Sequence, residues 1–180
     1  RYEIILVNDS SLDGSWNTIR QLKEKYNDYL IAIHLRGNFG QHKALLCGFQ
    51  FAQGEYIITI DDDLQFYPED IELLIQRIHT TRADLVYGTY MDERKHSPVR
   101  RWGSNFMGFV FEKFGNTVGQ GSSFKIIHRS VIDKIKDYNH SFTFVDEILS
   151  WHTTKIEWQQ VRHAERREGQ SGYSITKLVF

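Results

Sequence analysis

Short apolar runs alternate with amphipathic stretches through the first half of the sequence, and this order constrains the fold most. The apolar runs, bounded by turn-forming residues, lie at 3–7, 30–35, 56–60 and 84–90. Between them, apolar residues recur with helical spacing at 15–26, 41–53 and 68–78. Strands that alternate with helices predict an α/β fold, with a mostly parallel central sheet covered by helices on both faces.

The second half of the chain is less regular but still predicts both kinds of element. A strand is expected at 122–128, helices at 129–137 and 144–152, and a further strand at 158–163. A chain of 180 residues is long enough for one domain with a sizeable core and short for two.

The composition excludes several classes of protein. The 22 lysines and arginines nearly balance the 23 aspartates and glutamates, so no charge excess indicates a nucleic-acid partner. The single cysteine, Cys47, rules out an internal disulfide, and the eight histidines lack the spacing of zinc ligands. No run approaches the roughly 20 apolar residues of a membrane-spanning helix.

Three consecutive aspartates, Asp61, Asp62 and Asp63, follow the apolar run at 56–60. In open α/β sheets, ligands bind beyond the carboxyl ends of the strands. On an extended backbone Asp61 and Asp63 point the same way, Asp62 turns aside, and Gln65 takes the next alternate position. Carboxylates in this arrangement suit Mg²⁺ or Mn²⁺, held together with the phosphates of a substrate. The motif therefore predicts a metal site.

Two other interpretations of the aspartates were weighed. A calcium EF-hand is excluded, because Phe66 stands where that loop needs glycine and Pro68 interrupts it. An acidic strand end that is simply solvated stays open, although three neighbouring carboxylates repel one another.

Four segments, in this order, resemble family 2 glycosyltransferases with the GT-A fold. They are "VNDSSLDGS", "RGNFGQHKALLCGFQFAQGEYIITIDDDLQFYPEDI", "QGSSFKIIHRSVIDKI" and "RREGQSGYSITKL", and together they span nearly the whole chain. The sequence is most similar to the dolichyl-phosphate-mannose-synthase-like group, which often loads a sugar onto a polyprenyl phosphate at a membrane. The resemblance implies one catalytic domain, 1–180, with a nucleotide-sugar-binding half at 1–92 and an acceptor-binding half at 93–180.

The resemblance assigns a donor pocket to the first two loops. Asp9 matches an aspartate that contacts the nucleobase in the family, and Asn8 replaces the aspartate before it. The base is therefore open, with a UDP-sugar favoured and a GDP-sugar the alternative. Asp13 closes the same turn and either belongs to the pocket or caps the next helix. The loop before the second helix matches the pocket-lining loop at Gly37, Asn38 and Gly40.

The same resemblance assigns the metal motif and its surroundings. Asp61 and Asp63 match the metal-binding aspartates, Asp63 being expected to act in catalysis as well, while Asp62 and Gln65 belong to the same motif. The family usually opens with a strand carrying a "PxYNE"-like motif, which is absent here. Since the sequence also starts without Met, we expect it to be a piece of a longer protein that lacks the opening strand.

Transfer in this family inverts the anomeric centre, which implies one in-line displacement with a nucleoside diphosphate as leaving group. A bound cation would neutralise the charge that gathers on the diphosphate. Arg166, Arg167, Ser171 and Tyr173 lie in a motif expected to close over the phosphates, although a solvated loop is the alternative. Relatives often carry a lysine where Gly172 stands.

The base that would deprotonate the acceptor is not evident. Many relatives place an aspartate where Ser123 stands, which leaves Asp146 and Glu147 as candidates; both also suit the first turn of a helix. A phosphate-monoester acceptor has a second pKa near 6 and needs little help from a base, whereas a sugar hydroxyl needs one. The weak case for a base favours a lipid-phosphate acceptor.

A basic and aromatic segment at 94–114 fits a membrane-associated enzyme. Its arginines and lysine precede an apolar aromatic stripe, which suits a helix in a membrane interface, although the stripe also suits packing on the sheet. We therefore expect action at the cytoplasmic face of a membrane. Three alternatives remain: transfer to a saccharide hydroxyl in polysaccharide or lipopolysaccharide synthesis, a receiver-like phosphoacceptor domain, and an inactive nucleotide-binding fragment.

Overall fold

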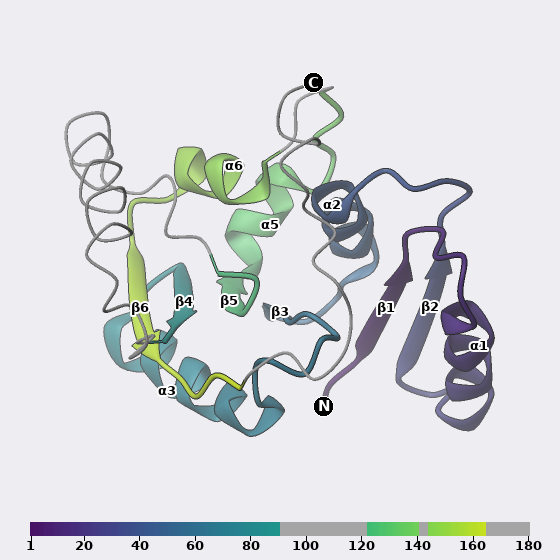
Figure 1. Cartoon of the computed structure of the whole chain (residues 1–180). Helices are drawn as coiled ribbons and strands as arrows, with labels where there is room; N and C mark the ends of the chain where they lie inside the picture. Colours follow the sequence, from purple (N-terminus) through teal and green to yellow (C-terminus); the bar gives the residue numbers. More distant parts are fainter. Residues whose placement is uncertain (91–121, 141–143, 165–180) are drawn as a thin grey trace, which may run out of the picture.

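Strands and helices alternate along the first half of the chain as the sequence predicts (Figure 1). The structure, a computed structural model, describes residues 1–90, 122–140 and 144–164. Its elements are β1 (Ile4–Asn8), α1 (Ser15–Lys25), β2 (Leu30–His34), α2 (Gln41–Phe51), β3 (Tyr56–Thr59), the 3₁₀ turn η1 (Pro68–Asp70), α3 (Ile71–Thr81), β4 (Leu85–Thr89), β5 (Lys125–His128), α5 (Arg129–Ile135), α6 (Val145–His152) and β6 (Ile156–Gln160).

The described strands form two sheets. β1 and β2 pair in parallel, and the larger sheet has the order β3-β5-β4-β6. β5 runs antiparallel to β3 and to β4, whereas β6 is parallel to β4. Three of these four strands therefore share one direction, and the prediction of a mostly parallel sheet is confirmed. β5 and β6 come from the second half of the sequence, so both predicted halves contribute to one sheet.

Helices cover both faces of the larger sheet, as predicted. Along β4, Leu85 and Tyr87 pack with α2, α5 and α6, while Val86 between them packs with α3 on the opposite face. This alternation follows from the two-residue period of a strand. Leu85, Val86 and the neighbouring Ile126 and Ile127 of β5 are fully buried, which places the core on the two sides of β4 and β5.

The smaller sheet is less covered than its sequence suggests. The run in β1 predicts a buried strand, but Ile4 is 43% exposed and the rest of the run is only half-buried. Among the described strands, β1 pairs with β2 alone and β3 with β5 alone, so each has one edge without a strand beside it. The expected opening strand stays a prediction.

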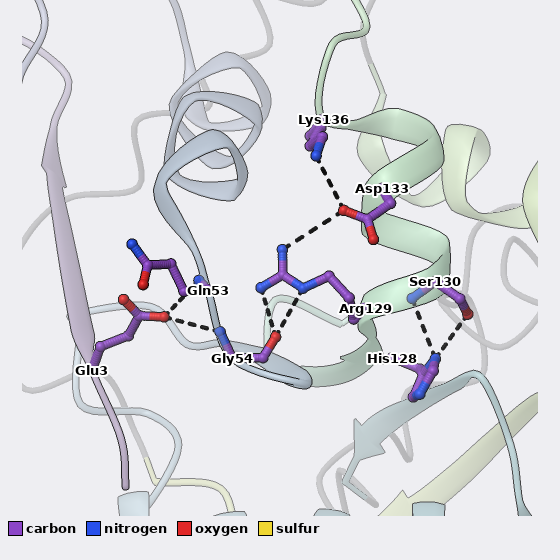
Figure 2. A network of polar contacts seen from close by, with 8 residues as sticks. All are labelled: Glu3, Gln53, Gly54, His128, Arg129, Ser130, Asp133 and Lys136. Carbon is purple, nitrogen blue, oxygen red and sulfur yellow. Dashed lines mark hydrogen bonds and ion pairs between the residues drawn. The ribbon is translucent and has the colours of Figure 1, made fainter.

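A polar network joins the two sheets at the amino ends of their strands (Figure 2). The carboxylate of Glu3, just before β1, accepts hydrogen bonds from the backbone N–H groups of Gln53 (2.6 Å) and Gly54 (3.0 Å). Arg129, at the start of α5, donates to the Gly54 carbonyl through Nε (2.9 Å) and Nη2 (2.6 Å). The carboxyl ends of β1, β2 and β3 therefore lie on the side of the sheets away from this network.

Gly88 in β4 provides a test of the packing near those carboxyl ends. A Cβ atom at this position would lie 2.8 Å from a ring carbon of Phe124 and 3.3 Å from Val161. Gly88→Ala should lower the free energy of unfolding by about 1–3 kcal/mol, measured in urea, because both neighbours belong to the core. Gly14→Ala is the control, since nothing lies within 4 Å of its Cβ. Equal losses at both glycines would contradict the packing described.

Candidate functional site

The loops that follow β1, β2 and β3 meet at the carboxyl ends of these strands. Asp9, after β1, accepts hydrogen bonds from the backbone N–H groups of Phe39 (2.8 Å) and Gly40 (2.7 Å) in the loop after β2. Gln41, the first residue of α2, donates from Nε2 to Asp61 Oδ1 at 2.8 Å. Gly40 has φ 89°, a backbone conformation that favours glycine. The structure thus brings together the three motifs that the sequence singled out.

The first turn uses its polar side chains mainly to hold the backbone. Asn8 is 3% exposed and accepts a hydrogen bond from Ser11 N (2.9 Å), while its buried Nδ2 has no partner among the described residues. Asp13 accepts from Ser15 N (2.9 Å) at the entry to α1, and these hydrogen bonds from Ser15 lower the pKa of Asp13. The N-cap position of α1 is Gly14, and no side chain makes a capping hydrogen bond there. Both alternatives for Asp13, the pocket and the helix cap, stay predictions. Nucleotide contacts by Asn8 and Asp9 stay predictions.

The aspartate triplet, Asp61–Asp63, lies in a turn and not on an extended strand. β3 ends at Thr59, and Leu64 after the triplet has φ 59°. The assumption of an extended backbone through the triplet was wrong, yet Asp61 and Asp63 are both half-buried and Asp62 is exposed, as the metal hypothesis needs. Asp63 Oδ1 accepts a hydrogen bond from Gln65 N at 3.1 Å, and this local contact stabilises the turn.

The electrostatics of Asp61 suit a cation. Burial raises the pKa of Asp61, and the charges of Asp63 and Asp62 raise it further, while hydrogen bonds from Ser123 and Gln41 oppose the shift. A divalent cation between Asp61 and Asp63 would offset this repulsion with the oxygen ligands that Mg²⁺ and Mn²⁺ prefer. No group of three or more His, Cys, Asp or Glu side chains in the described part of the chain could hold a metal.

The raised pKa of Asp61 predicts a stability gain on neutralisation. A carboxyl group with a higher pKa in the folded than in the unfolded state stabilises the protein when protonated and destabilises it as pH rises through the folded pKa. Asp61→Asn should therefore raise the free energy of unfolding in urea at pH 7 without divalent metal. The gain over the wild type should disappear below about pH 4, where the wild-type carboxyl is protonated in both states. A loss of stability at pH 7 would contradict this prediction.

A cavity of about 320 Å³ opens beside the triplet. Its lining combines carboxylate, amide and hydroxyl groups with aromatic rings: Asp61, Gln65, Phe66, Gly88, Thr89, Tyr90, Ser122, Ser123 and His163. The rings of Tyr90 and His163 stack with centroids 3.7 Å apart, and Phe66 meets both edge-on. A concave site that combines aromatic rings with converging polar groups is a candidate small-molecule pocket.

Asp146, one candidate base, takes part in a buried ion pair. Its Oδ1 pairs with Nζ of Lys125, which is 1% exposed, and accepts a hydrogen bond from the Tyr87 hydroxyl at 3.0 Å. Burial lowers the pKa of Lys125, although the negative charge of Asp146 partly offsets this effect. Burial also raises the pKa of Tyr87, and here the charge of Asp146 acts in the same direction. Glu147, the other candidate, lies half-buried in the first turn of α6. A base role for either residue stays a prediction.

His42 lies next to this ion pair and was missed in the sequence. Its Nδ1 accepts from Val145 N (3.4 Å), and its ring lies 4.7 Å from that of Phe144. Burial lowers the pKa of His42, so the neutral ring is favoured. His42 comes from the first turn of α2 and Val145 from the start of α6, so the contact joins the donor half to the predicted acceptor half.

Other contributors were also missed, each with a signal that was available. Gln41 ends the motif "RGNFGQ", and Lys125 is a charged residue inside the apolar strand "FKII". The predicted phosphate-binding residues and the aromatic segment at 94–114 lie outside the described residues; the former are Arg166, Arg167, Ser171 and Tyr173.

Comparison with known proteins identifies the class. The family model for glycosyl transferase family 2 matches residues 1–136, and the chain belongs to this family. The receiver-like phosphoacceptor alternative is therefore wrong. In the part of the chain that the structure describes, no helix has the length and apolar character needed to cross a membrane.

Two similar curated proteins carry the same name. Undecaprenyl-phosphate 4-deoxy-4-formamido-L-arabinose transferase from Pseudomonas fluorescens is 32% identical over 186 residues, covering 99% of this chain and 52% of the relative. The protein of that name from Pseudomonas syringae pv. syringae is 32% identical over 184 residues, covering 99% and 53%. The chain thus spans about half the length of these relatives.

Solved structures show the fold. Glucosyl-3-phosphoglycerate synthase from Mycobacterium tuberculosis, in complex with phosphoglyceric acid, has a TM-score of 0.63 at 17% identity, covering 93% of this chain and 62% of that one. The mannosyltransferase PcManGT from Pyrobaculum calidifontis, in complex with GDP-Man and Mn²⁺, has a TM-score of 0.61 at 14% identity, covering 94% and 49%. The predicted GT-A fold is confirmed.

Proposed function

We propose that this chain is the catalytic domain of an inverting, metal-dependent glycosyltransferase that moves a sugar from a nucleoside-diphosphate sugar to a polyprenyl phosphate. The observation that carries the proposal is the convergence of the loops after β1, β2 and β3, with half-buried Asp61 and Asp63 beside the cavity. The named activity of the relatives supports the choice of acceptor, and the GDP-Man and Mn²⁺ in a structural neighbour support the choice of donor and metal.

The donor would lie across the three loops. Asp61 and Asp63 would hold Mg²⁺ or Mn²⁺, which supplies positive charge to the diphosphate as it leaves. Gln41 orients Asp61, and Gln65 fixes Asp63 through its backbone N–H. The sugar would occupy the cavity between Asp61 and the stacked rings of Tyr90 and His163, where the hydroxyls of Ser122 and Ser123 offer hydrogen bonds.

The acceptor follows from the state of the candidate bases. Asp146 Oδ1 is already engaged by the Lys125 ammonium group and the Tyr87 hydroxyl, so this oxygen is not open to an acceptor hydroxyl. A phosphate monoester, already ionised near neutral pH, needs no such base. This favours a polyprenyl phosphate over a saccharide hydroxyl. Because a polyprenyl phosphate is a membrane lipid, the proposal includes action at a membrane surface, on its cytoplasmic face.

A transfer assay tests the proposal. The chain is incubated with Mn²⁺ and radiolabelled UDP-glucose, UDP-4-deoxy-4-formamido-L-arabinose or GDP-mannose in detergent micelles that contain undecaprenyl phosphate or undecaprenol. Labelled lipid should form from one donor with undecaprenyl phosphate alone and disappear with EDTA. Transfer to undecaprenol, or to an added saccharide instead, would overturn the phosphate acceptor. No transfer from any donor, with no Mn²⁺-dependent binding of UDP or GDP by calorimetry, would overturn the activity.

A further inference from the structure

Asp70 stands where an aspartate normally caps a helix, but its carboxylate is used elsewhere. It occupies the N-cap position of α3, and its side chain makes no capping hydrogen bond. The residue is 3% exposed, and a buried carboxylate needs a partner that meets its charge.

The partner of Asp70 is Arg162, which lies two residues beyond the end of β6. Arg162 donates to Asp70 Oδ1 through Nε (2.8 Å) and Nη2 (2.6 Å), and its backbone N–H donates to Oδ2 (2.7 Å). Its guanidinium carbon also lies 4.7 Å from the ring centroid of Tyr67. Burial alone would raise the pKa of Asp70, but the hydrogen bonds and charge of Arg162 outweigh it and lower that pKa. Because Asp70 accepts hydrogen bonds from both the backbone and the side chain of Arg162, it holds the position of the main chain there as well as balancing the guanidinium charge.

The segment at 161–164 continues from this pair along the metal motif. His163 forms an antiparallel bridge with Phe66, and Ala164 N donates to Gln65 O at 2.8 Å. Gln65 N in turn donates to Asp63 Oδ1 at 3.1 Å. A short series of backbone contacts therefore connects the Asp70–Arg162 pair to one of the two predicted metal ligands.

The same segment forms one wall of the cavity. Val161 N donates to Thr89 O (2.8 Å), so the segment lies between the end of β4 and residues Gln65 and Phe66. Thr89, Phe66 and His163, one from each of these places, line the cavity. Immediately after Ala164 the chain reaches Arg166 and Arg167, the residues expected to contact the phosphates. A shift of this segment would therefore move both the turn that carries Asp63 and the cavity wall at His163.

We propose that Asp70 and Arg162 are positioning residues of the donor site: the pair holds the 161–164 segment against Gln65 and Phe66 and so fixes Asp63 for the metal. Neither residue touches the reacting groups. The inference rests on the proposed function for its effect on metal binding, whereas its effect on the segment itself can be measured without any ligand.

Two readouts on the full chain test the pair. In Asp70→Asn and in Arg162→Gln, the Mn²⁺ concentration that gives half-maximal UDP binding should rise about 10-fold or more, the range for losing a partner that orients a metal ligand. Without metal, amide hydrogen exchange of residues 61–67 should accelerate in both variants. Arg77→Gln is the control: it removes the arginine–carboxylate pair between α3 and β6, Arg77 to Glu157 at 2.7 Å. Glu157 lies near the start of β6, whereas Arg162 lies beyond its end.

The outcomes separate this inference from the function. A lower melting temperature with unchanged exchange at 61–67 and an unchanged Mn²⁺ requirement would overturn it, because the pair would then be merely structural. The same rise in Arg77→Gln would also overturn it. If the wild type shows Mn²⁺-dependent binding of neither UDP nor GDP, the proposed function fails, and the exchange of residues 61–67 alone decides whether the pair positions this turn.

Discussion

Asp63→Asn should lower the affinity for UDP in the presence of Mn²⁺ by at least roughly 10- to 100-fold, the loss seen when even a supporting partner of a metal ligand is removed. Asparagine keeps the size of the side chain and its capacity to accept the hydrogen bond from Gln65 N, but it removes the negative charge that a hard cation needs. Calorimetric titration of UDP with Mn²⁺, repeated with EDTA, measures the effect. The same loss is expected for Asp61→Asn.

Asp62→Asn is the matched control for this prediction. It makes the same chemical change at the exposed middle position of the triplet, so net charge and composition change equally. Its UDP affinity should stay within a few-fold of the wild type. Equal losses in all three variants would indicate a general electrostatic effect of the acidic turn, and no loss in Asp63→Asn would remove Asp63 from the metal site.

Asp61 is expected to respond in opposite ways to one substitution, depending on whether metal is present. In the absence of metal, its neutralisation should stabilise the fold, because burial and the neighbouring carboxylates raise its pKa. In the presence of metal, the same change should weaken nucleotide binding. Opposite effects of one substitution on stability and on binding are expected where charge is held in place for a ligand.

The fold could be predicted well where the information is local. The apolar runs that became β3 and β4, and the helix spacing of α3, each lie within a short stretch of sequence, and the aspartate triplet lies directly after its strand. The place of β5 could not be predicted. It inserts antiparallel between β3 and β4, and nothing in the "FKII" run encodes which distant strands it will meet.

The site was predictable as a set of loops but not as a set of contacts. Asp9 was assigned to the nucleotide, and the structure shows both of its oxygens accepting from Phe39 and Gly40. Asp70 and Arg162 are 92 residues apart in the chain, and each has a common local explanation, a helix N-terminus and a solvated loop. Side chains that pair across such separations are determined by the tertiary fold, which a single sequence does not display.

Lys125→Met should destabilise the protein by about 3–5 kcal/mol, because it leaves the Asp146 carboxylate, whose side chain is 12% exposed, without its cation. Methionine keeps much of the length and the apolar stem of lysine, so the loss reports the charge more than the packing. The free energy of unfolding in urea measures it. Tyr87→Phe, which removes the hydrogen bond from the Tyr87 hydroxyl and leaves the ion pair with Lys125 in place, should lose about 1 kcal/mol.

The double variant Lys125→Met/Asp146→Leu separates the pair from its parts. Replacing a buried ion pair by apolar residues of similar size is often neutral or stabilising, so the double variant should recover most of the stability that Lys125→Met loses. An equal or larger loss in the double variant would show that Asp146 supports α6 through contacts other than the ion pair.

The double variant also tests the acceptor chemistry. If Asp146 is the base, transfer should be lost although the fold is restored. If the acceptor is a phosphate that needs no base, transfer should survive with the fold.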